Sequence, residues 1–347
     1  MAGSERRRAW VAAGVALLLA ACAQQPVNAP APAPGSYTAA TTYAKLAPRY
    51  PFIRIASAAV PASVRAVTDV TYARRDGDTR PHDLKLDLYL PAAGGAALRP
   101  AIVFVHGGGW RAGVRANFAP MAIRMAARGY AAATIDYRLA SDARYPAAIH
   151  DVKAAVRWVR AHAADYGIDP ARIAVAGASA GGQIAALTGV TNAEPRFDPD
   201  ARAGGVSSAV QAIVNIDGLS DFTSAEARKY EDDPAKQPSS AGAWFGGRYA
   251  EKAALWRDAS PLFHVGPGMP PILFIGSAQR RFSLGRDDVV AKLKALGIAT
   301  DIVLVPDTPH SFWLFDPWLG PTVEATDAFL RKVIPPRTDP PGSRPAP

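Results

Sequence analysis

Ser179 lies in a stretch whose residue types and spacing suit nucleophilic catalysis. It is the middle residue of GASAG at 177–181, a G-x-S-x-G pattern. The apolar run 172–178 precedes it and a helical segment over 180–190 follows it, so the serine falls on a sharp strand-to-helix turn that exposes its hydroxyl. Glycines suit such a turn because side chains would collide there. The alternative is a glycine-rich turn that merely connects two elements.

A second glycine-rich segment, HGGG at 106–109, follows the buried run 100–106. Backbone N–H groups fixed in such a loop can stabilise the negative charge that develops on a carbonyl oxygen during acyl transfer. Loss of one such donor raises the barrier by roughly 3–4 kcal/mol. We expect the N–H groups of Gly108, Gly109 and Ala180 to form this oxyanion hole. A phosphate-binding loop is disfavoured, since no P-loop lysine follows and no helix begins on the glycines.

A serine nucleophile needs a general base, and the chain has six histidines. Five have other expected places: in the glycine loop (His106), on a helix (His150, His162), before a strand (His82), or after a polar stretch, where it could be structural or face the substrate (His264). His310 lies in a loop after the last predicted strand and follows Ser179 in chain order, which is typical of serine hydrolases. We therefore predict that His310 is the base.

These residues require a scaffold, and the chain alternates strands with helices. Strands are predicted at 67–74, 84–90, 100–106, 130–137, 172–178, 210–217, 271–277 and 300–306. Helices are predicted near 115–128, 146–164, 180–190, 286–296 and 320–333. Continuous apolar strands alternating with helices predict a mostly parallel sheet covered on both faces. Residues 219–260 interrupt the alternation with a polar stretch, which predicts a short lid or loop.

Both ends of the chain differ in composition from its middle. Residues 1–21 hold three arginines and a short apolar run, which is typical of an export signal. Leu19-Ala20-Ala21-Cys22 resembles the lipobox of bacterial lipoproteins and places the only cysteine at the lipidation position; a plain secretory signal is the alternative. We expect a disordered tether over 22–45, a catalytic domain over 46–335 and a disordered tail over 336–347.

Charge and composition exclude several kinds of partner. The formal net charge is +9, but the basic residues are scattered, which favours a solvated surface over a nucleic-acid site. No cluster of His, Cys and Asp has the spacing of a metal site, and no nucleotide fingerprint occurs. We expect no cofactor and no metal. The partners would be a small or polysaccharide ester and, through Cys22, a membrane in the bacterial cell envelope. Because Ala23 follows the cysteine, resemblance to lipoprotein sorting favours the outer membrane.

Several segments together carry a family resemblance. HGGGW at 106–110, DYRLA at 136–140, the run 145–182 and PHSFWLF at 309–315 resemble the α/β-hydrolase superfamily, in particular its esterases with an HGGG oxyanion loop. The later segments NIDGLSDF, AWFGG, LWRDASPLFHV and GRDD resemble bacterial secreted esterases that remove acetyl or feruloyl groups from plant polysaccharides. The resemblance implies an eight-stranded α/β-hydrolase fold and serine carboxylester hydrolysis.

The resemblance leaves the triad acid unassigned, because Gln279 stands where most such hydrolases carry Asp. Asp287, beyond Gly285 at the start of a helix, is our choice, since the loop could carry it back across the site. The alternatives are its neighbour Asp288, Asp217 at the end of the preceding strand, and Asp307 near His310. The alternative role for Asp287 is that of a simple helix cap.

Two further questions stay open from the sequence. Six aromatic residues could wall an acyl or sugar pocket or simply belong to the core: Trp110, Trp244, Phe245, Trp256, Phe312 and Trp313. Gln279 also leaves open a hydrolase-fold binding protein that has lost catalysis, and the triad motifs alone do not distinguish an esterase from a peptidase or acyltransferase on the same fold.

Overall fold

The computed structural model describes residues 36–77, 81–93, 97–201, 205–277 and 279–335. The predicted signal segment, Cys22, the first part of the predicted tether and the predicted tail lie outside these described residues.

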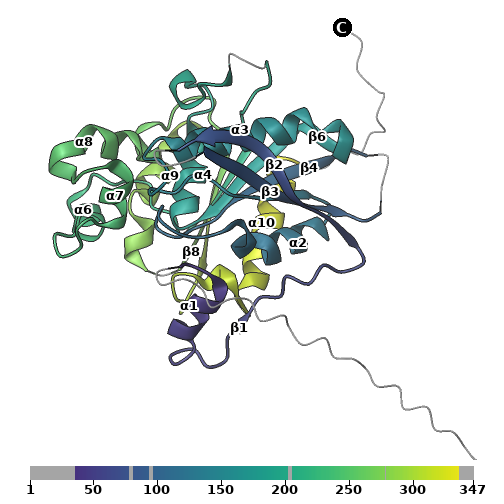
Figure 1. Cartoon of the computed structure of the whole chain (residues 1–347), viewed down its shortest axis with the longest axis horizontal. Coiled ribbons are helices and arrows are strands. Elements are labelled where there is room, and N and C mark those ends of the chain that lie inside the picture. Colours follow the sequence, from purple (N-terminus) through teal and green to yellow (C-terminus); the bar gives the residue numbers. More distant parts are fainter. Residues whose placement is uncertain (1–35, 78–80, 94–96, 202–204, 278, 336–347) are drawn as a thin grey trace, which may run out of the picture. The chain divides into compact units, whose positions relative to one another are not determined.

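One eight-stranded sheet forms the centre of the described chain (Figure 1). Its strand order is β2-β3-β5-β4-β6-β7-β8-β9. The strands are β2 (Val64–Asp76), β3 (Pro81–Pro91), β5 (Ala131–Ile135), β4 (Arg99–Val105), β6 (Ile168–Ala178), β7 (Ala212–Ile216), β8 (Ile272–Ser277) and β9 (Thr300–Val305). The β2–β3 and β3–β5 pairs are antiparallel, and the other neighbours pair in parallel. The expected α/β-hydrolase architecture with its eight strands is confirmed.

Helices cover both faces of this sheet because its strands are apolar on both sides. Residues Val103 and Val105 of β4 belong to one buried cluster, and Ile102 and Phe104 belong to the other. Burying one such side chain contributes roughly 1.5–3 kcal/mol. The first cluster includes α3 (Ala147–Ala161), α4 (Ala180–Val190) and α9 (Arg286–Ala295), and the second includes α2 (Ala119–Ala126) and α10 (Leu319–Val333).

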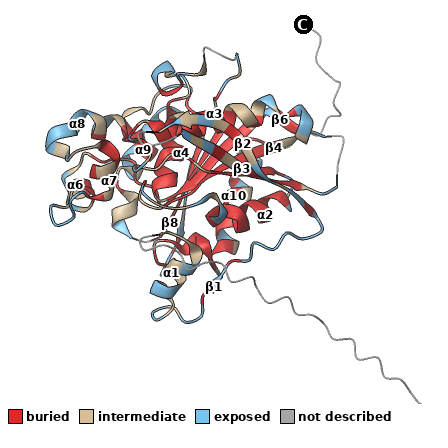
Figure 2. Cartoon of the chain, viewed as in Figure 1, coloured by how far each residue is buried: buried red, intermediate tan, exposed pale blue. Residues whose placement is uncertain are grey.

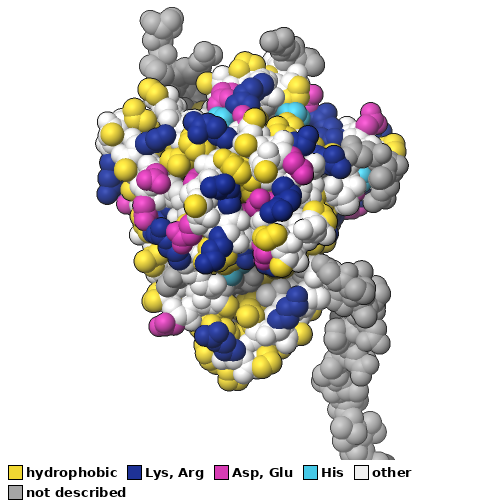
Figure 3. All heavy atoms as spheres, turned by 90° about the vertical axis from the view of Figure 1, so that its left-hand side faces the viewer, with side chains coloured by type: hydrophobic (Ala, Val, Ile, Leu, Met, Phe, Trp, Pro, Cys, Tyr) yellow, Lys and Arg dark blue, Asp and Glu magenta, His cyan; other side chains and the backbone are white. Residues whose placement is uncertain are grey.

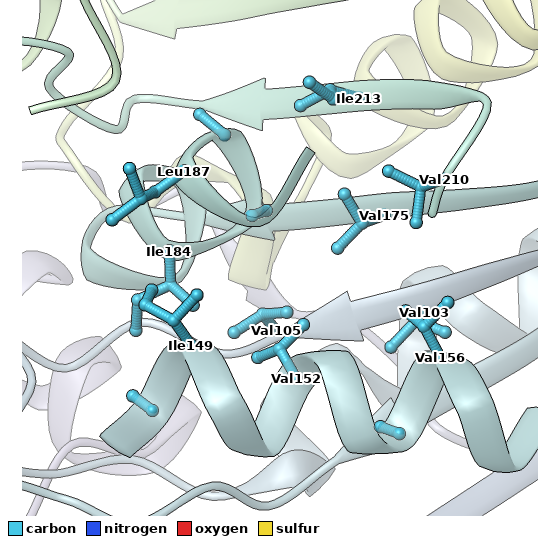
Figure 4. Close-up of a cluster of buried hydrophobic side chains, with 14 of the residues drawn as sticks. Val103, Val105, Ile149, Val152, Val156, Val175, Ile184, Leu187, Val210 and Ile213 are labelled. Atoms are coloured by element: carbon cyan, nitrogen blue, oxygen red, sulfur yellow. The ribbon is translucent and has the colours of Figure 1, made fainter. Parts of the chain in front are cut away.

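Figure 4 shows the first cluster, in which α3 and α4 pack side by side against the strands. Ile149, Val152 and Val156 of α3 face Val103 and Val105 of the sheet. Their three- and four-residue spacing is that of one helix face. Figure 2 shows the resulting band of buried residues through the centre of the molecule.

The insertion predicted over 219–260 forms three short helices. They are α6 (Ala225–Glu231), α7 (Ser240–Phe245) and α8 (Tyr249–Asp258). Ser224 and Ser239 begin the first two by accepting hydrogen bonds from Ala227 N and Gly242 N. Among the described residues, no helix is both long and apolar enough to cross a membrane.

The N-terminal part of the described chain is more structured than expected. The helix α1 (Ala39–Leu46) occupies the last part of the predicted tether. Thr38 caps it, since its Oγ1 accepts from Thr41 N and Thr41 Oγ1 in turn accepts from Thr38 N. A short strand β1 (Arg54–Ile55) then pairs with β10 (Phe315–Asp316). The folded part therefore begins before residue 46, because α1 packs on the body of the chain.

The charged side chains form no single basic patch on the face drawn in Figure 3, where Lys and Arg are interspersed with acidic and apolar groups. Many of the arginines form ion pairs with carboxylates, for example Arg138 with Asp151 and Arg281 with Glu231. This mixture is typical of a solvated protein surface.

Candidate active site

Ser179 lies at the turn between β6 and α4 with a strained backbone. Its φ is 56° and its ψ is −124°, a region that side chains rarely adopt. The two flanking glycines are required by close approach: a Cβ at Gly177 would lie 2.1 Å from the Gly181 oxygen, and one at Gly181 would lie 2.1 Å from the Val105 oxygen. The G-x-S-x-G pattern is therefore needed for the turn that presents the serine hydroxyl.

His310 connects the serine to a carboxylate. Its Nε2 lies 2.8 Å from Ser179 Oγ, and its Nδ1 lies 3.0 Å from Asp217 Oδ2. Its side chain, in the loop after β9, keeps 22% of its surface exposed. In this arrangement Nδ1–H donates to the carboxylate and Nε2 is free to accept the serine proton, as in a catalytic triad.

Asp217 follows β7 directly and is held by two further hydrogen bonds. Ser277 N donates to its Oδ1 at 2.7 Å, and Ser277 Oγ donates to its Oδ2 at 2.6 Å. The residue has a positive φ of 48° and is 4% exposed. Together with the imidazole, these donors provide hydrogen bonds to both oxygens of a buried carboxylate.

The structure does not bring Asp287 to His310, so our expectation for the position of the acid is wrong. The side chain of Asp287 is 63% exposed in the first turn of α9 and pairs with Arg286 at 2.8 Å. The chain after β8 turns through the short helix η5 (Arg280–Ser283) and places an aromatic ring, not a carboxylate, on the histidine. Asp287 therefore matches the alternative expectation of a charge at a helix N-terminus.

Gln279 and Phe282 in this loop both contact the histidine segment. Gln279 Nε2 donates to the Thr308 backbone oxygen at 3.3 Å, which braces the loop that carries His310. The Phe282 ring stacks on the imidazole with a centroid distance of 3.3 Å and an interplanar angle of 8°. Burial lowers the pKa of His310 from its ordinary value, while the hydrogen bond and charge of Asp217 act in the opposite direction.

The HGGG loop provides backbone donors beside the serine. Gly108 has φ 127°, and a Cβ there would lie 2.0 Å from the Ala112 oxygen. In the described chain, the N–H groups of Gly108 and Gly109 donate to no protein acceptor, and both residues line the pocket that contains Ser179. Gly108 and Gly109 therefore lie beside the serine, as an oxyanion hole requires, and the contribution of Ala180 at the start of α4 stays a prediction.

The remaining histidines have partners away from the serine. His106 is buried, its Nδ1 lies 2.9 Å from the Gly107 oxygen, and its ring stacks on Tyr137. Burial lowers its pKa. His264 contacts Glu194 through Nδ1 at 2.7 Å. Among the described residues, no group of His, Cys, Asp and Glu side chains could hold a metal ion.

A pocket of about 700 Å³ opens above the serine. It is bounded by Ser179 and His310, by part of the oxyanion loop over 108–112, by Arg281 with Phe282, and by the N-terminal segment over 36–45. Tyr37 holds this segment in place: its hydroxyl donates to Ser311 Oγ at 3.2 Å, and its backbone oxygen accepts from Asn117 Nδ2 at 3.0 Å. Burial raises the pKa of Tyr37 to about 12, so the hydroxyl stays protonated.

The six aromatic residues considered for the pocket wall are core residues. Each is buried, and none lines the pocket above Ser179. Trp110 stacks on Trp244 at 5.2 Å between centroids, and its Nε1 donates to Gln183 Oε1 at 3.0 Å. Trp110, Trp244, Phe245 and Trp256 join the insertion to the sheet, whereas Phe312 and Trp313 belong to the buried cluster on the other face.

Sequence reasoning missed three residues of this site: Ser277, Phe282 and Tyr37. Ser277 ends an apolar strand, and Tyr37 lies in a Pro/Ala-rich stretch, so neither has a local signal for its role. Phe282 lies in a loop where the sequence predicted a carboxylate and gave no signal for an aromatic contact with the histidine. All three act through contacts between segments that are distant in sequence.

Several curated esterases are similar to this chain in sequence. Esterase LipC of Mycobacterium tuberculosis is 35% identical over 243 residues, which cover 67% of this chain and 58% of LipC. The probable carboxylic ester hydrolase LipM of the same organism is 30% identical over 268 residues, which cover 72% of this chain and 57% of LipM. The chain thus spans only part of the length of these curated relatives.

Solved structures give the same fold. Esterase 2 of the planctomycete Thermogutta terrifontis, with butyrate bound, has a TM-score of 0.63 at 28% identity, covering 80% of this chain and 96% of that one. A truncated carbohydrate esterase from gut microbiota has a TM-score of 0.63 at 23% identity, covering 77% of this chain and 95% of that one. The second likeness bears on the fold alone.

The BD-FAE family matches residues 86–281, which is more than half of the chain. The matched region contains the oxyanion loop, Ser179, Asp217 and Ser277. With its α/β-hydrolase fold and with the esterases of Mycobacterium tuberculosis as relatives, the chain belongs to the BD-FAE family.

Proposed function

We propose that this protein is a serine carboxylester hydrolase. The observation that carries the proposal is the hydrogen-bonded series from Ser179 Oγ to His310 Nε2 at 2.8 Å and from His310 Nδ1 to Asp217 Oδ2 at 3.0 Å. It lies beside unpaired backbone donors in an open pocket. Relatives named as esterases support the same reaction class.

In the proposed mechanism, Ser179 Oγ attacks the ester carbonyl while His310 Nε2 takes its proton. The carbonyl oxygen, now negative, is stabilised by the N–H groups of Gly108, Gly109 and Ala180. His310 then passes the proton to the leaving alcohol. Water, activated by the same imidazole, releases the acid from the acyl-serine, and Asp217 stabilises the imidazolium in both halves of the reaction.

The short helices of the insertion support a proposal for the acyl group of the substrate. We propose short acyl groups, with acetyl preferred over long chains, because α6, α7 and α8 are short and present no large apolar lid. Carbohydrate esters, acetylated or feruloylated, are the proposed natural class. The likeness to a carbohydrate esterase is consistent with this substrate class, but at 23% identity it supports only the fold.

The competing function, a binding protein without catalysis, was favoured by Gln279 in the usual acid position. Asp217 removes that argument because it supplies a carboxylate to His310 from the neighbouring strand. Peptidase or acyltransferase chemistry would use the same triad, so substrates must distinguish these reactions.

Reaction of the purified protein with a fluorophosphonate probe tests the proposal directly. Labelling of Ser179, and loss of p-nitrophenyl acetate turnover in Ser179→Ala with an unchanged circular dichroism spectrum, is the expected result. An unreactive Ser179 in folded protein would support the binding protein. A panel of acetylated xylan, feruloyl esters, p-nitrophenyl esters of increasing chain length and aminoacyl amides then identifies the substrate class.

We also propose that the protein is lipid-anchored through Cys22 in the bacterial envelope, at the outer membrane. The lipobox-like sequence and the single cysteine support this localisation. In a Gram-negative host, the wild type should fractionate with membranes, and Cys22→Ser should accumulate as precursor or soluble protein. A soluble wild type whose N-terminus is not residue 22 would contradict the proposal.

A further inference from the structure

The Lys, Arg, Asp and Glu side chains that line the pocket above Ser179 are all cationic. Lys45, Arg111 and Arg281 line it, and no Asp or Glu does. They come from three separate parts of the chain: Lys45 from α1, Arg111 from the end of the oxyanion loop and Arg281 from the loop after β8. The positive character is therefore a property of the assembled pocket, not of one basic run in the sequence.

The three cations are not equally neutralised. Arg281 pairs with Glu231 at 2.8 Å, and the Glu231 side chain is only 6% exposed. Lys45 and Arg111 are exposed and form no ion pair within the described part of the chain. The carboxylate of Asp217 accepts hydrogen bonds from His310 and Ser277 and does not line the pocket. Two uncompensated positive charges thus remain at the pocket mouth.

A second pocket shows that this is not a general property of the surface. The pocket of about 500 Å³ beside α7 is lined by Arg144, Lys236 and Arg248 together with Asp232 and Glu251. Arg248 pairs with Asp232 at 3.2 Å, so its charges are largely balanced. A concave surface with charges of one sign raises the local concentration of oppositely charged ligands, whereas a balanced pocket does not.

We propose that the Ser179 pocket selects esters that carry a carboxylate close to the reacting carbonyl, with Lys45 and Arg111 as specificity-determining residues. The inference rests on the proposed ester hydrolysis and names its substrate class. Because a carboxylate is charged in the bound substrate as well as in the transition state, the two cations act mainly on KM and on the rate of encounter.

Matched substrate pairs test this selectivity on both sides of the ester. On the alcohol side, 4-acetoxyphenylacetate is compared with 4-acetoxyphenylacetamide, and on the acyl side p-nitrophenyl hydrogen adipate with p-nitrophenyl adipamate. Each pair differs by one negative charge at nearly constant shape. Each kcat/KM is divided by the hydrolysis rate of the same substrate in buffer, which removes differences in intrinsic reactivity.

For the wild type at low ionic strength, we expect the anion to be preferred over its amide by about tenfold or more in at least one pair, and the preference to shrink as salt screens the two exposed cations. In the double variant Lys45→Gln with Arg111→Gln, the ratio should fall towards one, mainly through KM. Lys45→Arg keeps the charge and should keep the ratio.

Lys294→Gln is the matched control, because Lys294 is exposed on α9 and does not line the pocket. It lowers the net charge of the protein by one and should leave the anion-to-amide ratio unchanged. If the double variant fails to fold by circular dichroism, the two single variants and the salt dependence of the wild-type ratio decide instead.

Three results would overturn the inference: no preference for the anion in either pair, a double variant that retains the wild-type ratio, or a Lys294→Gln variant that loses it equally. Failure of the proposed function looks different. In that case the ester bonds of the neutral, carboxamide-bearing substrates are not hydrolysed either, and Ser179 does not react with the fluorophosphonate probe.

Discussion

The loops that follow the neighbouring strands β7 and β8 both contact His310, but with different chemistry. The β7 loop contributes a carboxylate at once, since Asp217 is the first residue after the strand and accepts from the imidazole at 3.0 Å. The β8 loop contributes no carboxylate to the histidine, and the charge of its Arg281 lowers the pKa of His310. It provides an amide that braces the Thr308 backbone and a phenyl ring stacked on the imidazole.

This difference shows that the position of the acid depends on which carboxylate can reach the imidazole and on the groups that hold that carboxylate in place. Asp217 is positioned by its own positive φ of 48° and by two donors from Ser277, the last residue of β8. The strand that lacks the carboxylate thus supplies the groups that hold it. One loop is predicted to stabilise charge during catalysis, and the other to set the environment of the base.

The largest expected effect distinguishes the two loops directly. Asp217→Asn should lower kcat for p-nitrophenyl acetate at neutral pH by on the order of a thousandfold or more, because an amide cannot stabilise the imidazolium. Asp287→Asn, the matched loss of charge in the first turn of α9 just after the β8 loop, should change kcat by less than about twofold, as expected for an exposed surface pair. A crippled Asp287→Asn enzyme with an active Asp217→Asn enzyme would reverse the comparison.

A smaller effect tests the support that β8 gives to the acid. Ser277→Ala removes the hydroxyl that donates at 2.6 Å to the oxygen shared with His310. We expect kcat to fall about tenfold, which corresponds to one hydrogen bond to a charged group. Gln279→Ala, which removes a longer contact to the backbone of the histidine loop, should cost about threefold. Steady-state kinetics on both variants checks the order, and a larger loss for Gln279→Ala would contradict it.

The smallest effect is a change in the pH dependence. His310 must be neutral to act as a base, so kcat/KM should rise with pH through the pKa of this histidine, which burial lowers below its ordinary value of about 6.5. Phe282→Ala exposes the imidazole of His310 to water, which should raise its pKa and move this acid limb to higher pH. Phe282→Leu keeps apolar cover and should move it less.

Asp217→Asn should shift the same limb in the opposite direction, to lower pH, because Asp217 raises the pKa of His310. The residual activity of this variant can be followed over the same pH range with a reactive aryl ester. Shifts of the same sign for Asp217→Asn and Phe282→Ala would show that the two loops do not act on the histidine in distinct ways.

The sequence was sufficient for the scaffold and for two of the three triad positions proposed. Apolar periodicity located all eight strands of the sheet, and local motifs pointed to Ser179 and His310, which the structure brings within 2.8 Å. These features are local: a glycine pattern at a turn, or a histidine after a strand. The predicted boundary of the tether is wrong, because the last part of the tether forms the short Ala- and Thr-rich helix α1. This helix depends on packing against residues distant in sequence.

The prediction of Asp287 as the acid is wrong because several aspartates follow strands on the same edge of the sheet. Asp217, Asp287, Asp288 and Asp307 all satisfy the order of the motifs, and only the backbone path decides which of them reaches the imidazole. The aromatic residues around 219–260 presented the same difficulty. Trp110, Trp244 and their neighbours have the composition of a pocket wall, but they pack on one another in the core.

The bond from the Tyr37 hydroxyl to Ser311 Oγ joins residues that are 274 positions apart. One wall of the pocket comes from near the start of the described chain, and the general base comes from near its end. Contacts of such long range close large loops and form late in folding, whereas the turn at Ser179 is made of residues close in sequence. During synthesis from the N-terminus, the nucleophile is therefore available well before the base, and a ribosome-bound or C-terminally truncated chain that ends before residue 310 carries a serine with no partner to activate it.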